Sequence, residues 1–332
     1  MVIGHQKQRD FLKQLIVLDK IPHAFLFFGE ARIGKKKTAL EFVKLMNCES
    51  GLGKKPCQNC YSCKSIENFQ HPDFIFIEAK EKEIQISQIR DIGKKLLLKP
   101  SQFKSKVVII DDAHLMNTEA QGALLKTLEE PRGNAILILI TEHPEMLLET
   151  IISRIQKIKF NPIKKEEIEK YLGKNGLSKE KINMISFLSL GKPGLAIDFI
   201  LNEEVLQKEI QKLKDLISII ATNDLALRFQ YAKKITTTEK SKIENLDLNN
   251  KKLKELLESW LNYFRDFLLM QTQAVSENNF YGTMDLKIDK ILKKYSLSRI
   301  IEIIKTIQKI IFSLSTTNSN QRLALEIIML EL

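Results

Sequence analysis

The sequence predicts an α/β fold with a mainly parallel sheet, followed by two regions that are entirely helical. Strand-like and helix-like segments alternate about five times within the first 160 residues, as in chains that build a parallel sheet from crossover units. The strand-like segments are short, continuous apolar runs, which is typical of strands that helices cover on both faces. After Pro162 the apolar residues recur at helical spacing instead.

Each element of the sheet region has its own signal. Strands are predicted where apolar or β-branched residues run together, at 24–28, 74–77, 106–110, 135–141 and 155–160. Helices are predicted where apolar residues recur every three or four positions, at 5–18, 35–47, 87–98 and 118–130. Ser87 is the expected N-cap of the third helix, and Asn117 or Thr118 that of the fourth.

Beyond Pro162 the pattern predicts three short helices, at 164–172, 178–190 and 195–201, which glycines separate. From residue 203 onward the chain is predicted to be helical, with polar gaps at 236–250 and 276–282. We therefore expect three domains, a sheet domain at 1–162, a small helical domain at 163–202 and a larger helical domain at 203–332.

Composition narrows the class of protein. Of the 332 residues, 44% are apolar and 28% are charged, which excludes wholesale disorder. No apolar run reaches the roughly 20 residues that span a bilayer, and the first residues lack the apolar core of a signal peptide. A cytoplasmic location and no membrane partner are therefore expected. The net charge of +11 indicates a polyanion such as DNA, although the Lys-, Ile- and Asn-rich usage of an AT-rich genome explains it equally.

The segment Gly29-Glu-Ala-Arg-Ile-Gly34-Lys35-Lys36 follows a predicted strand and opens a predicted helix. A P-loop, Gly-x4-Gly-Lys-[Ser/Thr], occupies this position and holds phosphates with backbone N–H groups and its lysine. Here Lys36 replaces the hydroxyl residue that ligates Mg²⁺. Three interpretations stay open: an active ATPase loop, a loop that binds ATP or another nucleotide without turnover, and a purely structural turn.

Two carboxylates follow the predicted strand at 106–110. Asp111 stands where a Walker B aspartate holds Mg²⁺ through water, and Asp112 stands where a glutamate usually polarises the attacking water. Because Asp112 is one methylene shorter than glutamate, we expect little catalysis from it. The alternative is a pair of carboxylates that caps the next helix.

All four cysteines of the chain fall within sixteen residues, as Cys48, Cys57, Cys60 and Cys63. Four thiolates at this spacing predict a closed, structural zinc site. An iron–sulfur cluster is the alternative, but its sequence pattern requires a further cysteine soon after Cys63, and Glu67 stands there. Free thiols are the third possibility.

The chain resembles the subunits of the bacterial DNA polymerase III clamp loader, which are AAA+ proteins. The resemblance rests on Ile21-Pro-His-Ala-Phe-Leu-Phe-Phe-Gly29, the four-cysteine knuckle, Ala123-Leu-Leu-Lys-Thr-Leu-Glu-Glu-Pro131 and Thr150-Ile-Ile-Ser153-Arg154. These motifs cover about residues 1–200, and the C-terminal third carries none. The resemblance implies an AAA+ module, a helical lid and a helical collar that joins a five-subunit ring.

The same resemblance implies roles for single residues and partners. Arg154 matches the arginine that reaches the ATP of a neighbouring subunit in this family, although a helix-end arginine paired with a local carboxylate is the plainer alternative. The expected partners are the other loader subunits and, through the complex, the sliding clamp and primed DNA. Lys36, and the lack of an arginine in Gly191-Lys-Pro-Gly194, favour a member of the family that does not hydrolyse ATP.

Two rival functions stay open. One is a clamp-loader subunit that hydrolyses its own ATP. The other is a zinc-bearing nucleic-acid-binding module with a relic fold, which salt-dependent binding of the isolated chain to DNA would support.

Overall fold

The computed structural model describes residues 2–50, 56–79, 82–130, 134–240, 246–272, 293–316 and 320–332. The chain forms two compact units, one of Met1–Ile182 with Ser189–Ile197 and the other of Asn183–Leu188 with Asp198–Leu332. The helices predicted for 163–202 are thus shared between the units, and the division into three domains stays a prediction. Among the described residues no helix has the length and apolarity that crossing a bilayer requires.

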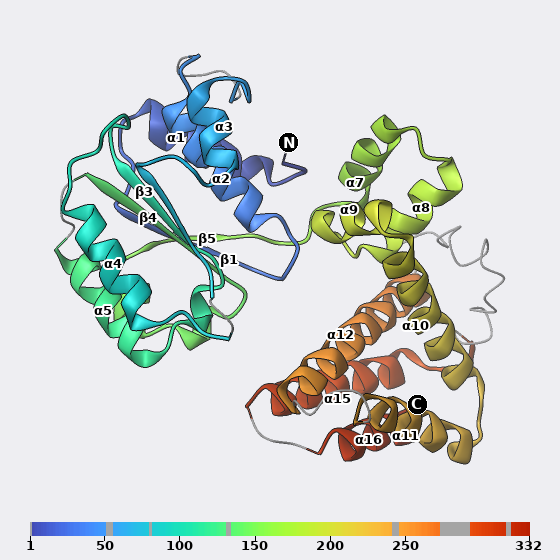
Figure 1. The fold of residues 1–332 in the computed structure, drawn as a ribbon. Coiled ribbons are helices and arrows are strands. Elements are labelled where there is room, and N and C mark those ends of the chain that lie inside the picture. The colour runs from blue at the N-terminus through green and yellow to red at the C-terminus, as the bar shows by residue number, and fades with distance from the viewer. Residues whose placement is uncertain are drawn as a thin grey trace. The chain divides into compact units, whose positions relative to one another are not determined.

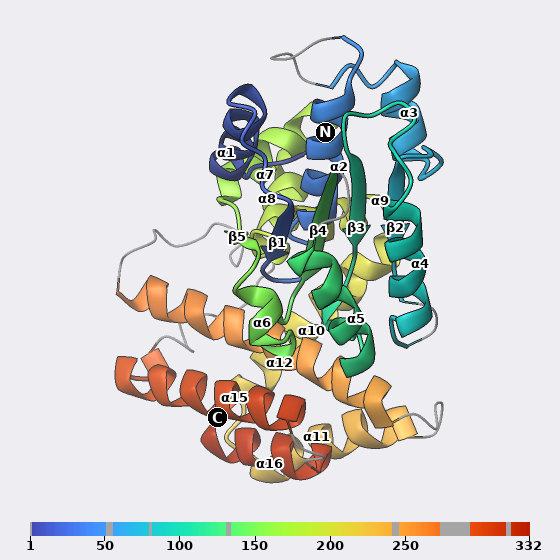
Figure 2. The same ribbon diagram turned by 90° about the vertical axis from the view of Figure 1, so that its left-hand side faces the viewer.

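The first unit is built on a sheet of five parallel strands in the order β2-β3-β4-β1-β5 (Figures 1 and 2). The sheet pairs β1 with β4 and β5, and β3 with β2 and β4. The predicted parallel sheet is therefore confirmed. The strands are Ala24–Phe28 (β1), Phe74–Ile77 (β2), Lys106–Ile110 (β3), Ala135–Thr141 (β4) and Gln156–Lys159 (β5).

Alternate residues of each strand enter two different cores, one on each face of the sheet. In β1, Phe25 and Phe27 pack with buried residues of the helices Gln6–Val17 (α1) and Lys35–Asn47 (α2). Leu26 points the other way, into the core of the helices Ile86–Leu96 (α4) and Thr118–Glu129 (α5). Both faces of the sheet are covered, which is why β1, β2, β3 and β4 are mostly apolar, whereas only Ile158 of β5 is buried.

Two helices in this unit were not predicted. Tyr61–Glu67 (α3) lies inside the cysteine segment, and Glu149–Ile152 (α6) precedes Arg154. Both are short, and short helices give little periodic signal. The predicted N-cap Ser87 is wrong: α4 begins at Ile86, because Gln85 donates its N–H to Oε1 of Gln88 at 3.0 Å.

Three helices follow the sheet, at Lys165–Leu172 (α7), Lys179–Leu188 (α8) and Pro193–Leu201 (α9). The second unit then continues with Glu203–Ala221 (α10), Leu225–Lys240 (α11), Leu246–Gln271 (α12), Leu297–Thr316 (α15) and Gln321–Glu331 (α16). The polar gap predicted at 236–250 is wrong over most of its length, because α11 and α12 extend into it and only 241–245 lie outside the described residues. The second predicted gap, at 276–282, lies outside the described residues.

The second unit is held together by apolar packing and by one buried arginine. Trp260, Phe264 and Phe267 on α12 are fully buried. The guanidinium of Arg228 is also buried, and it donates to the carbonyls of Ile219, Thr222 and Met329. A buried guanidinium that satisfies several carbonyls fixes the ends of α10 and α16 against α11.

Candidate functional site

The loop between β1 and α2 has both of the predicted P-loop glycines at positive φ angles. Gly29 and Gly34 have φ angles of 147° and 105°, which side-chain-bearing residues rarely adopt. A Cβ on Gly29 would in addition collide with the carbonyl oxygen of Phe160. Gly34 is the N-cap of α2, so the first N–H groups of this helix open onto the loop. The sequence-predicted loop is thus formed as a local structure.

Lys35 is buried under this loop, with 6% of its surface exposed. Its ammonium donates to the carbonyl oxygens of Gly29 at 2.7 Å and Glu30 at 2.6 Å. Burial lowers the pKa of Lys35, and the nearby carboxylates of Glu142 and Asp112 oppose that shift. In this conformation the lysine holds its own loop together, and it must turn from these carbonyls to meet a phosphate.

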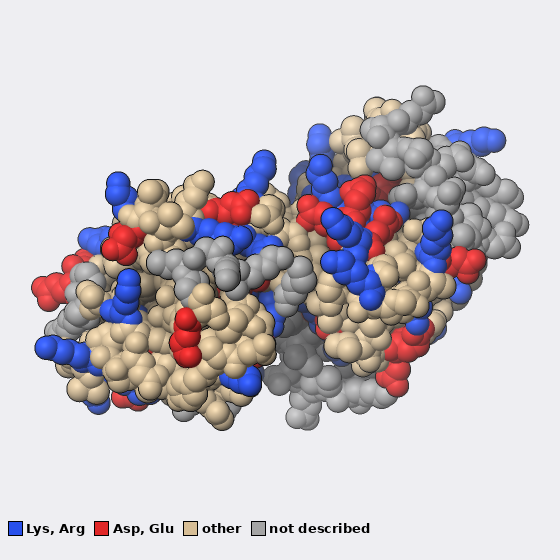
Figure 3. All heavy atoms as spheres, turned by 90° about the horizontal axis from the view of Figure 1, so that it is seen from above, with Lys and Arg blue, Asp and Glu red and all other residues tan. Residues whose placement is uncertain are grey.

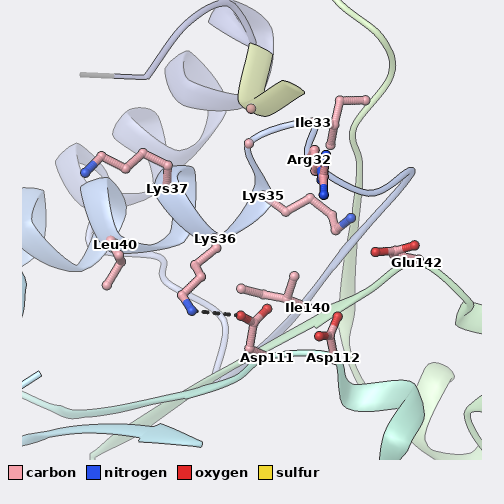
Figure 4. A pocket seen from close by; sticks show the side chains of 12 residues that line it. Arg32, Ile33, Lys35, Lys36, Lys37, Leu40, Asp111, Asp112, Ile140 and Glu142 are labelled. Atoms are coloured by element: carbon pink, nitrogen blue, oxygen red, sulfur yellow. Dashed lines mark ion pairs between the residues drawn. The ribbon is translucent and has the colours of Figure 1, made fainter. Parts of the chain in front are cut away.

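The two predicted carboxylates differ in their partners. Asp111 forms an ion pair with Lys36, whose Nζ lies 3.1 Å from Oδ2 of Asp111. The dashed line in Figure 4 marks this pair. Asp112 adopts φ 47° at the start of the short helix Ala113–Leu115, and its side chain makes no capping hydrogen bond to that helix. The capping alternative for Asp112 is therefore wrong. Asp112 and Lys35 point into the same pocket (Figure 4).

Sequence reasoning missed three residues at this site. Glu142 follows β4 directly and points toward Lys35 in Figure 4. His5 is buried below the loop, where its Nε2 lies 2.7 Å from the carbonyl oxygen of Ile33. Lys192 pairs with Glu30 at 2.8 Å. Only Glu142 had a usable signal, because a charge immediately after a buried strand lies at the edge where ligands bind.

One cavity of about 410 Å³ lies at the carboxyl ends of β3 and β4, and it is lined by Gly34, Lys35, Lys36, Asp111, Asp112 and Glu142 among others. The segment that opens α9 closes one side, where Gly194 donates its N–H to the carbonyl of Arg32 at 2.8 Å. Of the five residues predicted for the nucleotide site, the structure brings Gly34, Lys35, Asp111 and Asp112 together in one pocket, whereas Gly29 is not among the residues that line it.

Arg154 lies away from this pocket, after α6 and before β5. Its guanidinium pairs with Glu129 of α5 at 3.0 Å and donates to the carbonyl of Thr150 at 2.9 Å. The side chain is 39% exposed and that of Glu129 is 51% exposed. An ion pair this exposed contributes at most about 1 kcal/mol, so a stronger anion can take the guanidinium from Glu129.

The four cysteines meet in space. Their sulfur atoms all lie within 4.8 Å of one another, and Sγ of Cys57 is 4.0 Å from Sγ of Cys63. A tetrahedral zinc with bonds of about 2.3 Å separates its sulfur ligands by about 3.8 Å, so small shifts would complete the site. The donor set fits a closed structural metal centre held by Cys48, Cys57, Cys60 and Cys63, with no position left for substrate.

Backbone N–H groups already point at the sulfurs. Those of Asn59 and Cys60 donate to Sγ of Cys57, at 3.5 and 3.2 Å, and that of Cys63 donates to Sγ of Cys60 at 3.4 Å. Hydrogen bonds from Ser50 and these N–H groups lower the pKa of Cys57 to about 5. Such bonds stabilise thiolates, which is the protonation state that binds metal.

The cysteine module, by which we mean the four-cysteine segment and α3 (residues 48–67), is attached to α2, the helix that follows the predicted phosphate loop. Lys44 of α2 is almost fully buried and donates to Gln58 at 2.9 Å and to the carboxylate of Glu67. Glu67, at the end of α3, also accepts from Lys37 at 2.8 Å. One carboxylate of the cysteine module thus binds two lysines of α2.

On the face drawn in Figure 3, Lys and Arg side chains lie among Asp and Glu side chains and form no unbroken basic field. On this face the net charge of +11 is therefore not concentrated in one patch that could bind a polyanion.

Comparison with known proteins finds a matching family model in the first half of the chain. Residues 4–164 match a family model described as DNA polymerase III, delta subunit. The chain is 31% identical over 308 residues to DNA polymerase III subunit tau of Bacillus subtilis (strain 168), covering 89% of this chain and 54% of that protein. It is 32% identical over 196 residues to subunit delta' of the same organism, covering 59% of each.

The chain thus spans little more than half the length of these curated relatives. Among solved structures, a gamma subunit-related DNA polymerase III protein of Thermotoga maritima covers 97% of both chains at 19% identity and a TM-score of 0.38. That score is too low to support the fold, which rests on the strand order and register described above. Over residues 4–164, which form the sheet, the chain is therefore similar to subunits of DNA polymerase III.

Proposed function

We propose that this chain is a delta-prime-like subunit of the DNA polymerase III clamp loader, which does not hydrolyse ATP and lends Arg154 to the ATP site of a neighbour. In this proposal it assembles with gamma/tau and delta subunits into a five-subunit ring in the cytoplasm. The ring places the sliding clamp on primed DNA. The four cysteines hold a structural zinc that takes no part in catalysis.

The single observation that carries the proposal is the contact between Lys36 and Asp111. An AAA+ ATPase needs both a hydroxyl and this aspartate for Mg²⁺, and here an ammonium stands beside the aspartate at 3.1 Å. Asp112 adds to the argument, because the shorter side chain misplaces the group that would activate water. Arg154 supports the second half of the proposal, since its guanidinium is exposed and only weakly held.

A gamma/tau-like subunit that hydrolyses its own ATP is the second candidate. The alignment to subunit tau of Bacillus subtilis favours it, because that alignment covers 89% of this chain and the one to delta' covers 59%. The loop also retains both of its glycines, and Lys35 and Asp111 line the pocket.

One experiment separates the two candidates. The full chain is purified alone and together with gamma/tau and delta subunits, and ATP hydrolysis is measured for each preparation. We expect a stable complex and no hydrolysis by the chain alone. Robust hydrolysis by the chain alone, abolished by Lys35→Ala, would establish the gamma/tau-like function. A chain that joins no complex but binds duplex DNA with a steep salt dependence would instead establish the nucleic-acid-binding module.

A further inference from the structure

The pocket at the phosphate loop already contains a cation. Lys36 is the second residue of α2, and its side chain, which is 42% exposed, extends to Asp111 (Figure 4). Its ammonium lies 3.1 Å from Oδ2 of Asp111 and 3.9 Å from Oε2 of Glu78. The carboxylate that would face a divalent metal is therefore paired with a side chain of the same protein.

Two aromatic rings hold this ammonium in place. Nζ of Lys36 lies 4.3 Å from the ring centroid of Phe76 and 5.7 Å from that of Phe69. Both distances fall in the range where a cation is attracted to the negative face of a ring. Phe76 belongs to β2, and Phe69 follows α3 at the end of the cysteine module. Two carboxylates and two rings thus converge on one ammonium, which a chance surface lysine would not show.

The residues present do not fit Mg²⁺. The ion requires oxygen ligands in near-octahedral geometry, and an ammonium offers no lone pair and repels a dication. Thr38, the next hydroxyl along the helix, is buried and donates to the carbonyl of Gly34 at 3.0 Å. No other hydroxyl side chain lies among the described residues that line the pocket. Of the carboxylates that line the pocket, Asp111 stands at the metal position, and Lys36 neutralises it.

The glycine and the lysine of the predicted phosphate loop are both present at the pocket. The cavity of about 410 Å³ opens on the N-terminus of α2, Gly34 has the positive φ angle of such a loop, and Lys35 can meet a phosphate once its ammonium turns from the carbonyls of Gly29 and Glu30. A helix N-terminus with such a lysine attracts phosphate whether or not a metal is present. Without a dication the pocket favours the smaller negative charge of a diphosphate over that of a triphosphate, because Asp112 and Glu142 also face it.

We propose that the pocket binds a nucleoside diphosphate without a divalent cation, with the Lys36 ammonium taking the place of the metal beside Asp111. Mg²⁺ then neither strengthens nor is needed for binding. This inference goes beyond the proposed function. A pocket that binds nothing would leave the role of Arg154 and the assembly of the loader unaffected.

The test is a calorimetric titration of the full chain with ADP, once with excess EDTA and once with excess MgCl₂. We expect dissociation constants that agree within about twofold. Lys36→Thr restores the Gly-x4-Gly-Lys-Thr pattern and frees Asp111, so its affinity for ADP should rise about tenfold or more when Mg²⁺ is added. Electron paramagnetic resonance of Mn²⁺ with ADP gives a readout that does not depend on activity, and bound Mn²⁺ is expected only for Lys36→Thr.

Lys37→Thr is the matched control. It makes the same change one residue further along α2, where the lysine pairs with Glu67 and points away from Asp111 (Figure 4). It should behave as the unaltered chain does. Two results for the unaltered chain would overturn the inference without any variant: Mg²⁺ tightening ADP binding about tenfold, or no ADP binding under either condition.

Discussion

Glu67 shows how one side chain joins two functional segments. Its carboxylate accepts from Lys37 and Lys44, and these hydrogen bonds lower its pKa to about 2. Lys44 is buried, so its ammonium depends on Glu67 and on the amide oxygen of Gln58 for compensation. A buried ammonium that loses a partner keeps its cost of desolvation, whereas an exposed one regains water.

Glu67→Gln should therefore lower the free energy of unfolding of the sheet unit by about 2 kcal/mol, because Glu67 is half-exposed and water replaces part of the loss. Lys37→Met removes only the exposed ion pair between Lys37 and Glu67. It should lower the free energy of unfolding by about 0.5 kcal/mol or less. Urea denaturation of both variants measures the difference. Equal losses in the two variants would show that Lys44 does not need Glu67.

The stability of this unit should also depend on pH through His71. Its ring stacks on Phe103, its Nδ1 accepts from the N–H of Asp73 at 3.1 Å, and its Nε2 bonds Gln102 at 3.0 Å. Burial lowers the pKa of His71 below its ordinary value of 6.5. The folded state thus binds a proton on His71 less readily than the unfolded state does. Neutral His71 therefore contributes its full stabilisation of the fold above about pH 6.5, and this stabilisation is lost as the pH falls below that value.

We expect the urea concentration at the denaturation midpoint to decrease as the pH is lowered from 7 to 5. In His71→Gln the decrease should be less steep. Midpoints in urea at pH 7, 6 and 5 give the two slopes. Because zinc release in acid acts on both proteins alike, only the difference between the slopes reports on His71. Parallel slopes would remove His71 as the cause.

At the scale of single elements, α3 depends on the cysteines at its start. Cys60 is its N-cap and accepts from the N–H of Cys63, and only seven residues follow. A helix this short is unstable alone in water. A metal bound by all four thiolates would close the segment and hold α3 against α2.

We expect about one zinc per chain by mass spectrometry, as a single closed thiolate site requires. Cys60→Ser should lose the metal and increase amide hydrogen exchange over 61–67. Tyr61→Ser, in the same helix but exposed, should retain both the metal and the protection. A brown protein containing iron, or full zinc in Cys60→Ser, would contradict the four-thiolate zinc site.

A second element, α16, shows a face that its own unit does not cover. Leu323, Ile327 and Leu330 lie on successive turns of the helix and are 58%, 43% and 58% exposed. Ala324, Leu325 and Ile328 are buried on the other side. A helix that is apolar around most of its surface is normally covered on both sides. The exposed stripe suits the subunit contacts that the proposed function requires.

Ile327→Glu should weaken incorporation of the chain into the loader by about tenfold or more, because it buries a charge in that contact. The thermal midpoint of the isolated chain should hardly change, since the side chain already lies in solvent. Size-exclusion chromatography of the mixed subunits measures the loss. Lys305→Glu on α15 is the charge-changing control outside the stripe, and it should assemble normally.

At the scale of the whole molecule, patterning predicted the parallel sheet and nearly all of its helices, because buried strands and amphipathic helices leave distinct periodicities. It could not predict the order β2-β3-β4-β1-β5, which long-range pairing decides. Among site residues, Gly34, Lys35, Asp111 and the four cysteines were found from fixed spacings. Glu142 was missed although its place directly after a buried strand was a usable signal, and His5 was missed because only the fold brings it against the loop.

The contact between Lys36 and Asp111 marks the limit of sequence reasoning. The sequence shows that a hydroxyl is missing, but not that the ammonium lies on the metal's aspartate and beneath two aromatic rings. Likewise the motif around Arg154 indicates a role, while the weak, exposed pair with Glu129 shows that the guanidinium is available.

The most direct measurement is DNA-stimulated ATP hydrolysis by the reconstituted loader that contains Arg154→Ala. If this chain lends its guanidinium to a neighbour, hydrolysis at the site it serves should fall by a factor on the order of 10³, with the complex still assembled and with no rescue by Arg154→Lys. Glu129→Gln frees the same arginine and should leave the rate unchanged or raise it. Undiminished hydrolysis by the Arg154→Ala loader would contradict the account.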